Sequence, residues 1–279
     1  MSAEAERSRS RPRRAALFVP LLAACLAVVL AFLALPVVAI FVHAPPRRLL
    51  DALGEPVARE ALLLSLETSA IAMAIVVVLG TPAAYVLARR RLPGQAAILT
   101  VLELPLVLPP AVAGIGLLAA LGPAGILGGA LRDAHVELVL QTAGVVVALC
   151  FVASPFYIRQ AHASFLAIRR EMLEASADLG AREGTTLLRV ALPLARPGLL
   201  VGLALAWGRA LGEFGATLMF AGSFQGVTQT APLAIYDQFA NDLPAALALS
   251  AVLVIVSGVL LVSIKLVAGS PPALAGSGS

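Results

Sequence analysis

The sequence has few charged residues, and this scarcity excludes a soluble globular protein. Only 13% of its 279 residues are Asp, Glu, Lys or Arg, whereas 60% are hydrophobic, and the mean hydropathy is +0.95. So little polar surface cannot cover a globule of this size in water. The composition therefore predicts an integral membrane protein that lies in a lipid bilayer.

Residues that could form a chemical site are also scarce. The two cysteines, Cys25 and Cys150, lie in apolar segments without the spacing of a metal or redox motif, and the three histidines are scattered. The sequence contains no GxxxxGK[ST] phosphate-binding loop, no HExxH and no GxSxG. We therefore expect a chain that is not an enzyme and that has no cofactor or metal of its own.

Long apolar runs divide the chain into six predicted transmembrane helices. A helix of about 20 apolar residues spans the hydrocarbon layer of a bilayer, which is roughly 30 Å thick. We expect spans at residues 17–42, 61–87, 96–121, 138–157, 196–220 and 243–267. The first run is longer than the core of a signal peptide, so we interpret it as a retained helix and not as a cleaved leader.

Polar residues, glycines and prolines indicate the structure of the segments between the spans and of the two tails. Residues 1–14 predict a disordered basic tail and residues 269–279 a flexible one, which leaves the membrane domain at residues 15–268. Residues 45–60 are expected to form an amphipathic helix on the outer surface. Prolines break the third span, and such breaks are tolerated where the backbone faces protein or a wet cavity.

The basic residues predict the orientation of the chain. Fifteen of the 20 fall in segments that the six-span topology places on one side of the membrane, and four fall on the other. Because arginine and lysine are enriched on the cytoplasmic side, both termini and residues 169–198 are predicted to be cytoplasmic. The basic residues behind the formal charge of +4 are thus explained by the orientation of the chain in the membrane, and we expect no nucleic-acid binding.

Residues 169–198 form a polar island between two apolar segments. Helix-forming residues run from Glu171 to Gly180, and a glycine at that point suits a left-handed helix cap. A second helix is predicted from Glu183 to Leu192, where Pro193 should end it. The island therefore predicts a helical hairpin that projects from the membrane.

The residues of this hairpin resemble a known motif. Glu174-Ala175-Ser176, then Gly180 and, after nine intervening residues, Val190-Ala191-Leu192-Pro193 are similar to the EAA loop of ABC-transporter importer permeases. That family has alanine at the position of Ser176 and commonly isoleucine at that of Val190. In the family this loop docks on the ATPase. The resemblance therefore implies an ATPase-coupling role for Glu174, Ala175, Ser176, Gly180, Leu192 and Pro193.

A second resemblance lies in the fifth span. Residues 208–222 (GRALGEFGATLMFAG), residues 228–236 (TQTAPLAIY) and the third-span segment 104–110 (LPLVLPP) resemble the molybdate-importer permeases, and the similarity covers about residues 55–265. Sulfate and thiosulfate permeases carry related fifth-span sequences. The resemblance implies an all-α integral membrane protein with the type I ABC importer permease fold, which has six spans and a cytoplasmic coupling-helix hairpin.

The fifth span also carries two charges four residues apart. Arg209 and Glu213 are predicted to pair, because an isolated charge costs at least a few kcal/mol at membrane depth. They would either form a structural ion pair or line the pathway of the transported ion. The candidate translocation residues are Arg209, Gly212, Glu213, Gly215 and Thr217.

The family resemblance implies a complete transporter. It would contain a homodimer of this permease, two cytoplasmic ABC ATPase subunits that bind ATP and Mg²⁺, and an extracytoplasmic molybdate-binding protein, all at the bacterial inner membrane. The cargo would be molybdate or tungstate. A sulfate or thiosulfate permease is the alternative within the family. A proton-coupled secondary transporter is the alternative from another class, although we find no repeated halves of the kind common there.

Overall fold

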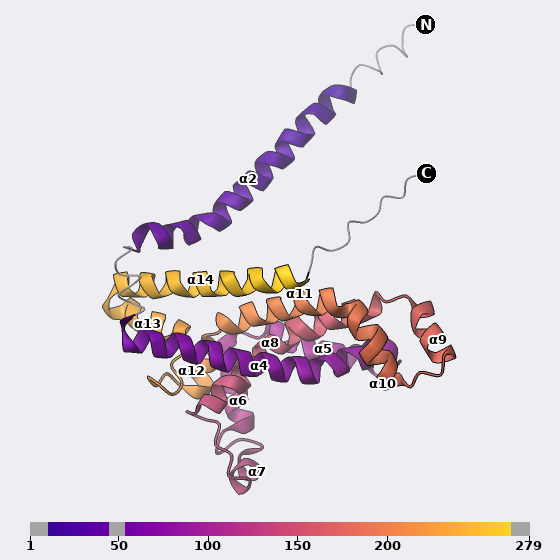
Figure 1. The fold of residues 1–279 in the computed structure, drawn as a ribbon. Coiled ribbons are helices and arrows are strands. Elements are labelled where there is room, and N and C mark those ends of the chain that lie inside the picture. Colours follow the sequence, from indigo (N-terminus) through magenta and orange to yellow (C-terminus); the bar gives the residue numbers. More distant parts are fainter. Residues whose placement is uncertain (1–10, 45–53, 269–279) are drawn as a thin grey trace.

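In the computed structural model, the described residues, 11–44 and 54–268, form helices and connecting turns, with no strand among them. The helices are arranged as an elongated bundle (Figure 1). Their bounds are α2 Arg11–His43, α4 Pro56–Arg89, α5 Gln95–Val107, α6 Pro110–Leu121, α7 Gly128–Asp133, α8 Thr142–Leu166, α9 Arg170–Asp178, α10 Glu183–Thr186, the π-helix η1 Leu187–Ala191, α11 Leu192–Leu211, α12 Gly215–Ala221, α13 Ala231–Asn241 and α14 Leu243–Ala268.

The centre of the bundle is formed by α4, α8 and α11, which pack against one another along their lengths. Their buried side chains are small or apolar, and they include Val145, Leu149, Tyr157 and Phe165 of α8. Small residues let the helix backbones approach closely, which is the usual basis of helix packing in membranes. This central packing fixes the ends of the three helices relative to one another.

Five of the helical segments are long and apolar enough to cross a membrane, and the bent pair α5 and α6 makes a sixth candidate span. The axes of α5 and α6 differ by 118°. The predicted break in the third span is therefore confirmed. Pro109 and Pro110 lie at the bend, where a proline ring disfavours helical geometry in the preceding residue.

The first span, α2, lies apart from the bundle and approaches it beside α14 (Figure 1). Almost all of its described side chains are exposed, including Phe32 and Val42. A helix this apolar is stable with such exposure only in lipid or against another protein. The four last residues of the predicted disordered tail, 11–14, belong to this helix, so that prediction is wrong for them; residues 1–10 and 269–279 lie outside the described residues.

Several predicted boundaries are wrong. α4 begins at Pro56, so residues 56–60 belong to the second span and not to a surface helix, while residues 45–53 lie outside the described part. α8 continues to Leu166, nine residues beyond its predicted end, because helix-forming polar residues follow its apolar run. The expected outer loops contain the helices α7 and α13.

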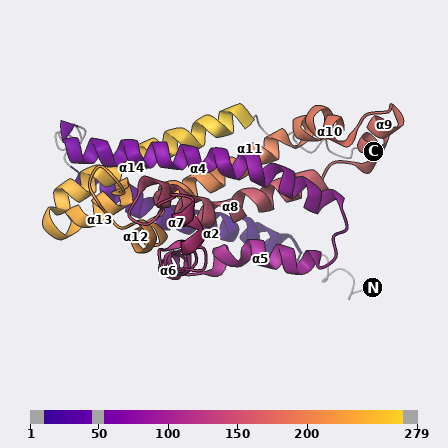
Figure 2. The same ribbon diagram turned by 90° about the horizontal axis from the view of Figure 1, so that it is seen from below.

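The two ends of the bundle differ. The segment from α9 to α10 lies at one end together with the turn between α4 and α5, whereas α13 lies at the opposite end (Figures 1 and 2). Most arginines of the hairpin and of the segment 89–91 are therefore at the same end. This arrangement places the predicted coupling residues and the fifth-span residues in two separate regions.

Candidate functional site

The first arm of the hairpin is the helix α9, and it ends in a Schellman motif. The N–H of Gly180 donates to the Ala177 carbonyl over 2.8 Å, and the N–H of Ala181 donates to the Ser176 carbonyl over 3.1 Å. Gly180 has a φ of 77°, so the predicted left-handed conformation is confirmed. Glycine adopts this conformation without the steric cost that other residues bear.

The three residues of the Glu-Ala-Ser motif lie on α9. The Ser176 hydroxyl lies 3.0 Å from the Thr186 hydroxyl, and this bond joins the two arms of the hairpin. Glu174 accepts a hydrogen bond from Arg170 over 2.7 Å at the surface. Ser176, which stands where the family has alanine, thus has a structural role within the hairpin.

Two large apolar side chains are exposed on the first arm of the hairpin, which is otherwise mostly polar. Leu179 is 89% exposed at the tip, and Met172 is exposed on the same helix.

The second arm differs from its prediction. Pro193 does not end a helix, because the chain remains helical from Glu183 through η1 to Leu211. In an α-helix the ring of Pro193 would clash with the carbonyl four residues earlier. The π turn at Leu187–Ala191, in which the N–H of Leu192 donates to the Leu187 carbonyl, widens the helix just before this proline.

Leu192 and Pro193 lie beside a cavity of about 460 Å³ between α4, α8 and α11. The cavity is mostly apolar and also borders Thr81 and Tyr157, whose hydroxyls lie 2.6 Å apart. The π turn and this cavity give the second arm space next to the central helices.

The fifth span is also shorter than predicted. α11 ends at Leu211 and α12 begins at Gly215, so the continuous helix expected over residues 196–220 is wrong. The interruption includes Gly212 and Glu213. Glycine weakens a helix because it has more conformational freedom to lose than other residues.

The predicted pair of Arg209 and Glu213 is confirmed. Arg209 Nη2 lies 2.5 Å from Glu213 Oε2, and the side chain of Glu213 is only 1% exposed. The other carboxylate oxygen, Oε1, accepts a hydrogen bond from the N–H of Ala216 over 2.7 Å. Glu213 therefore connects the end of α11 with the first turn of α12.

The other fifth-span candidates lie around the same interruption. Gly215 packs so close to α6 that a Cβ atom there would lie 2.9 Å from Pro110 Cβ. Thr217 is fully buried on α12, whereas Gly212 is exposed. The structure thus brings all five candidates together, with Glu213 and Thr217 facing the interior of the protomer and Gly212 and part of Arg209 accessible from outside it.

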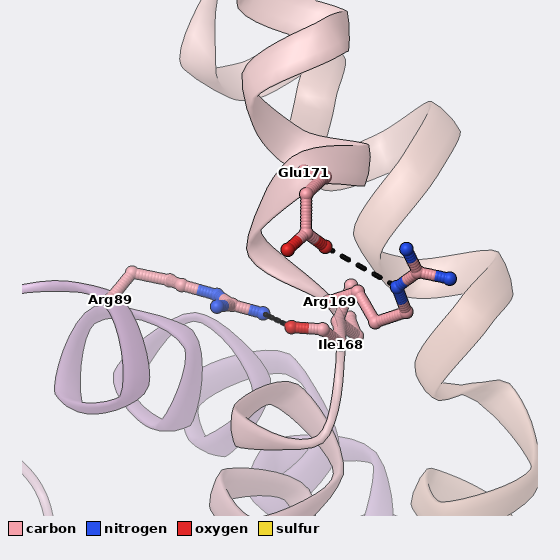
Figure 3. A network of polar contacts seen from close by, with 4 residues as sticks. All are labelled: Arg89, Ile168, Arg169 and Glu171. Carbon is pink, nitrogen blue, oxygen red and sulfur yellow. Dashed lines mark hydrogen bonds and ion pairs between the residues drawn. The ribbon is translucent and has the colours of Figure 1, made fainter.

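Two sets of polar contacts could not be identified from sequence spacing. Arg159 Nε of α8 lies 3.7 Å from Glu103 Oε1 of α5, so Arg159 is part of a helix and not of a cytoplasmic loop as predicted. Arg89 Nη2, at the end of α4, donates to the carbonyl of Ile168 over 3.3 Å (Figure 3). The arginine-rich composition of residues 89–91 was the only signal for this second contact.

Known proteins similar to this chain are membrane subunits of transporters. Residues 78–268 match the family described as "Binding-protein-dependent transport system inner membrane component". The "Molybdenum transport system permease protein ModB" of Mycobacterium tuberculosis is 43% identical over 233 residues, which cover 84% of this chain and 88% of that protein. The "Sulfate transport system permease protein CysW" of Synechocystis is 34% identical over 224 residues, which cover 79% and 81%.

The fold is similar to that of a solved transporter. A chain of a bacterial alginate ABC transporter, in complex with an alginate pentasaccharide-bound periplasmic protein, superposes with a TM-score of 0.72. The match covers 92% of this chain and 93% of that one, at 17% sequence identity. The expected all-α fold of type I ABC importer permeases is confirmed by this similarity.

Proposed function

The chain belongs to the family of binding-protein-dependent transport system inner membrane components and is a ModB-type permease of an ABC importer, and on this premise we propose that it carries molybdate into the cell. Tungstate, which is also a tetrahedral divalent oxyanion, is included in the proposed cargo. A binding protein outside the membrane delivers the anion, and two ATPase subunits in the cytoplasm drive its passage.

One observation carries the choice of cargo. The identity to a molybdenum permease is 43% over 84% of the chain, whereas the identity to a sulfate permease is 34% over 79%. The names of these relatives give molybdenum and sulfate as what they transport, so the difference in identity bears on the cargo of this chain. The higher identity over the longer stretch favours molybdate.

The arrangement of charges supports an anion as cargo. Glu213 would repel a divalent anion if it were unpaired, but it is buried and paired with Arg209 over 2.5 Å. Gly208, Gly212 and a fraction of the Arg209 side chain are exposed here, whereas the carboxylate of Glu213 is not. An anion meets no uncompensated carboxylate here, and tight binding is left to the binding protein.

Two copies of the chain are proposed to form the transporter. α5 is mostly apolar, yet none of its residues is buried within the protomer. On α11, Gly208 has open space in the direction of an added Cβ atom. A second copy would cover such surfaces, and the ion would cross between the two copies.

The hairpin is the proposed docking site for the ATPase. Its exposed Leu179 and Met172 suit an apolar groove on a cytoplasmic partner, and its Schellman cap fixes the direction in which the tip points. The ATP and Mg²⁺ belong to the partner, since the sequence has no phosphate-binding loop.

ATP hydrolysis tests this assembly. The permease is co-expressed with its proposed ATPase and binding protein, and the complex is purified and reconstituted in liposomes. Molybdate-loaded binding protein should stimulate hydrolysis several-fold more than the unloaded protein. A chain that transports molybdate with no ATPase bound would contradict the proposal and favour a secondary transporter.

A further inference from the structure

Arg89, the last residue of α4, contacts the chain just before the hairpin, and Arg90 contacts the start of its second arm. Arg89 Nη2 donates to the carbonyl of Phe165, in the last turn of α8, and to the carbonyl of Ile168, which lies between α8 and α9. Figure 3 shows the contact with Ile168. A cation at the C-terminus of a helix is favoured by the helix dipole. Arg89 therefore holds the point at which the chain enters the hairpin.

Arg90 contacts the opposite arm. Its Nη2 lies 2.6 Å from Oε1 of Glu183, the first residue of α10. Arg91 is exposed, and among the described residues its side chain makes no such contact. Two consecutive arginines thus join the end of α4 to the entry of the hairpin and to the start of its second arm, and the third provides a natural control.

On the N-terminal side of these arginines, one face of α4 also contacts α8. The Thr81 hydroxyl lies 2.6 Å from the Tyr157 hydroxyl, and the rings of Tyr85 and Phe165 meet edge to face with centroids 5.3 Å apart. Thr81, Tyr85 and Arg89 are spaced four residues apart, so they lie on the same helix face. The last turns of α4 are therefore attached to α8 and to the segment that leads into the hairpin.

The far half of α4 contacts the opposite end of the bundle. The N–H of Ala231, at the start of α13, donates to the Ser65 hydroxyl over 2.7 Å. Trp207 of α11 donates to the Ser69 hydroxyl over 2.9 Å. α4 is thus a continuous helix with polar attachments to the hairpin at one end and to α13 at the other.

We propose that Arg89 and Arg90 clamp the hairpin to α4, so that a displacement of the hairpin is transmitted directly through α4 to α13. Arg89 is the main positioning residue because it is partly buried and bonds two carbonyls, whereas the pair of Arg90 and Glu183 is exposed to solvent. The inference rests on the proposed function, in which the ATPase moves the hairpin.

Hydrogen exchange tests the clamp on the purified full-length permease without the ATPase. Arg89→Gln removes the clamp and one charge, and Arg91→Gln removes one charge only. Amides of residues 165–178 should exchange about tenfold faster in Arg89→Gln, because charge-assisted hydrogen bonds at the hairpin entry are lost. Arg91→Gln should exchange like the unchanged chain, and Arg89→Lys should lie between the two variants.

The second readout is molybdate uptake per ATP hydrolysed in the reconstituted complex. This ratio should fall in Arg89→Gln at an ATPase rate equal to that of Arg91→Gln. Arg90→Glu should also lower it, and adding Glu183→Arg should restore it, which tests the clamp even if Arg89→Gln does not fold.

Equal exchange in Arg89→Gln and Arg91→Gln would overturn the clamp, as would an unchanged uptake ratio. An unchanged chain that takes up no molybdate would instead contradict the proposed function, and the exchange rates would still decide the clamp.

Discussion

Arg209 Nη2 lies 2.5 Å from Glu213 Oε2 across the point at which α11 ends. The same carboxylate accepts the N–H of Ala216, so one buried side chain joins α11 to α12. The pair is therefore a part of the fold as well as a candidate for the pathway. Its two roles can be separated by comparing single and double substitutions.

Replacing Arg209 alone should be more harmful than removing both charges. Arg209→Ala leaves the buried Glu213 without its ion-pair partner, and breaking a buried pair in this way costs about 3–5 kcal/mol. Arg209→Ala with Glu213→Gln avoids that unpaired charge and keeps an acceptor for the Ala216 N–H. Thermal unfolding in detergent and molybdate uptake should both be less impaired in the double variant. Equal impairment of the two variants would contradict a coupled pair.

Gly180→Val should uncouple ATP hydrolysis from transport. The left-handed backbone at Gly180 strains a β-branched residue by about 1–3 kcal/mol, although an added Cβ atom would meet nothing within 4 Å. The strain should redirect the tip of α9 while leaving the membrane helices intact. ATPase activity and uptake are measured together in liposomes.

Gly184→Val is the matched control for this change. Gly184 also has open space, but it lies in α10 without a positive φ. It should therefore retain coupling. Normal uptake per ATP in Gly180→Val would show that the cap does not set the docking geometry.

Gly114→Ala should destabilise the contact between α6 and α12. A Cβ atom at Gly114 would lie 2.6 Å from the Ala216 carbonyl oxygen, and backbone atoms cannot move aside easily. Overpacking of this kind costs about 1–3 kcal/mol, so the unfolding temperature should fall. Gly116→Ala, on the same helix with nothing within 4 Å of the added atom, should unfold like the unchanged chain. A lower unfolding temperature in both variants would point to the helix itself and not to the contact.

Cysteines at Ala177 and Ser223 should react from opposite sides of the membrane. Both positions are exposed, one on α9 and the other in the segment after α12. In a background without Cys25 and Cys150, a membrane-impermeant maleimide should label Ser223→Cys in intact spheroplasts. Ala177→Cys should be labelled only after the membrane is opened. Labelling of both in intact spheroplasts would contradict the orientation predicted from the arginines.

The sequence predicts the helical class, the number of candidate spans and the cap at Gly180, because long apolar runs and a glycine after a helix are local signals. The interruption at Gly212 was missed because apolar residues flank it on both sides, and the local contacts of Glu213 that join α11 to α12 form no recognisable sequence pattern. Pro193 was misinterpreted because the π turn before it is not encoded by a recognisable local pattern.

The contacts of Arg89 could not have been predicted either. Its partners are the backbone carbonyls of residues more than seventy positions away. Every residue type has such a carbonyl, so the sequence does not indicate which ones accept a hydrogen bond. From the sequence, Arg89 was interpreted only as one of the basic residues that set the orientation of the chain in the membrane. Long-range polar contacts with the backbone become visible once the helices are packed.

Uptake of radiolabelled molybdate tests the central claim most directly. Proteoliposomes that contain the permease, its ATPase and its binding protein are supplied with ATP inside, and unlabelled tungstate or sulfate is added outside at the same concentration as molybdate. The account predicts ATP-dependent uptake that tungstate inhibits and sulfate leaves nearly unchanged. Strong inhibition by sulfate at equal concentration would contradict it and would identify the chain as a sulfate permease.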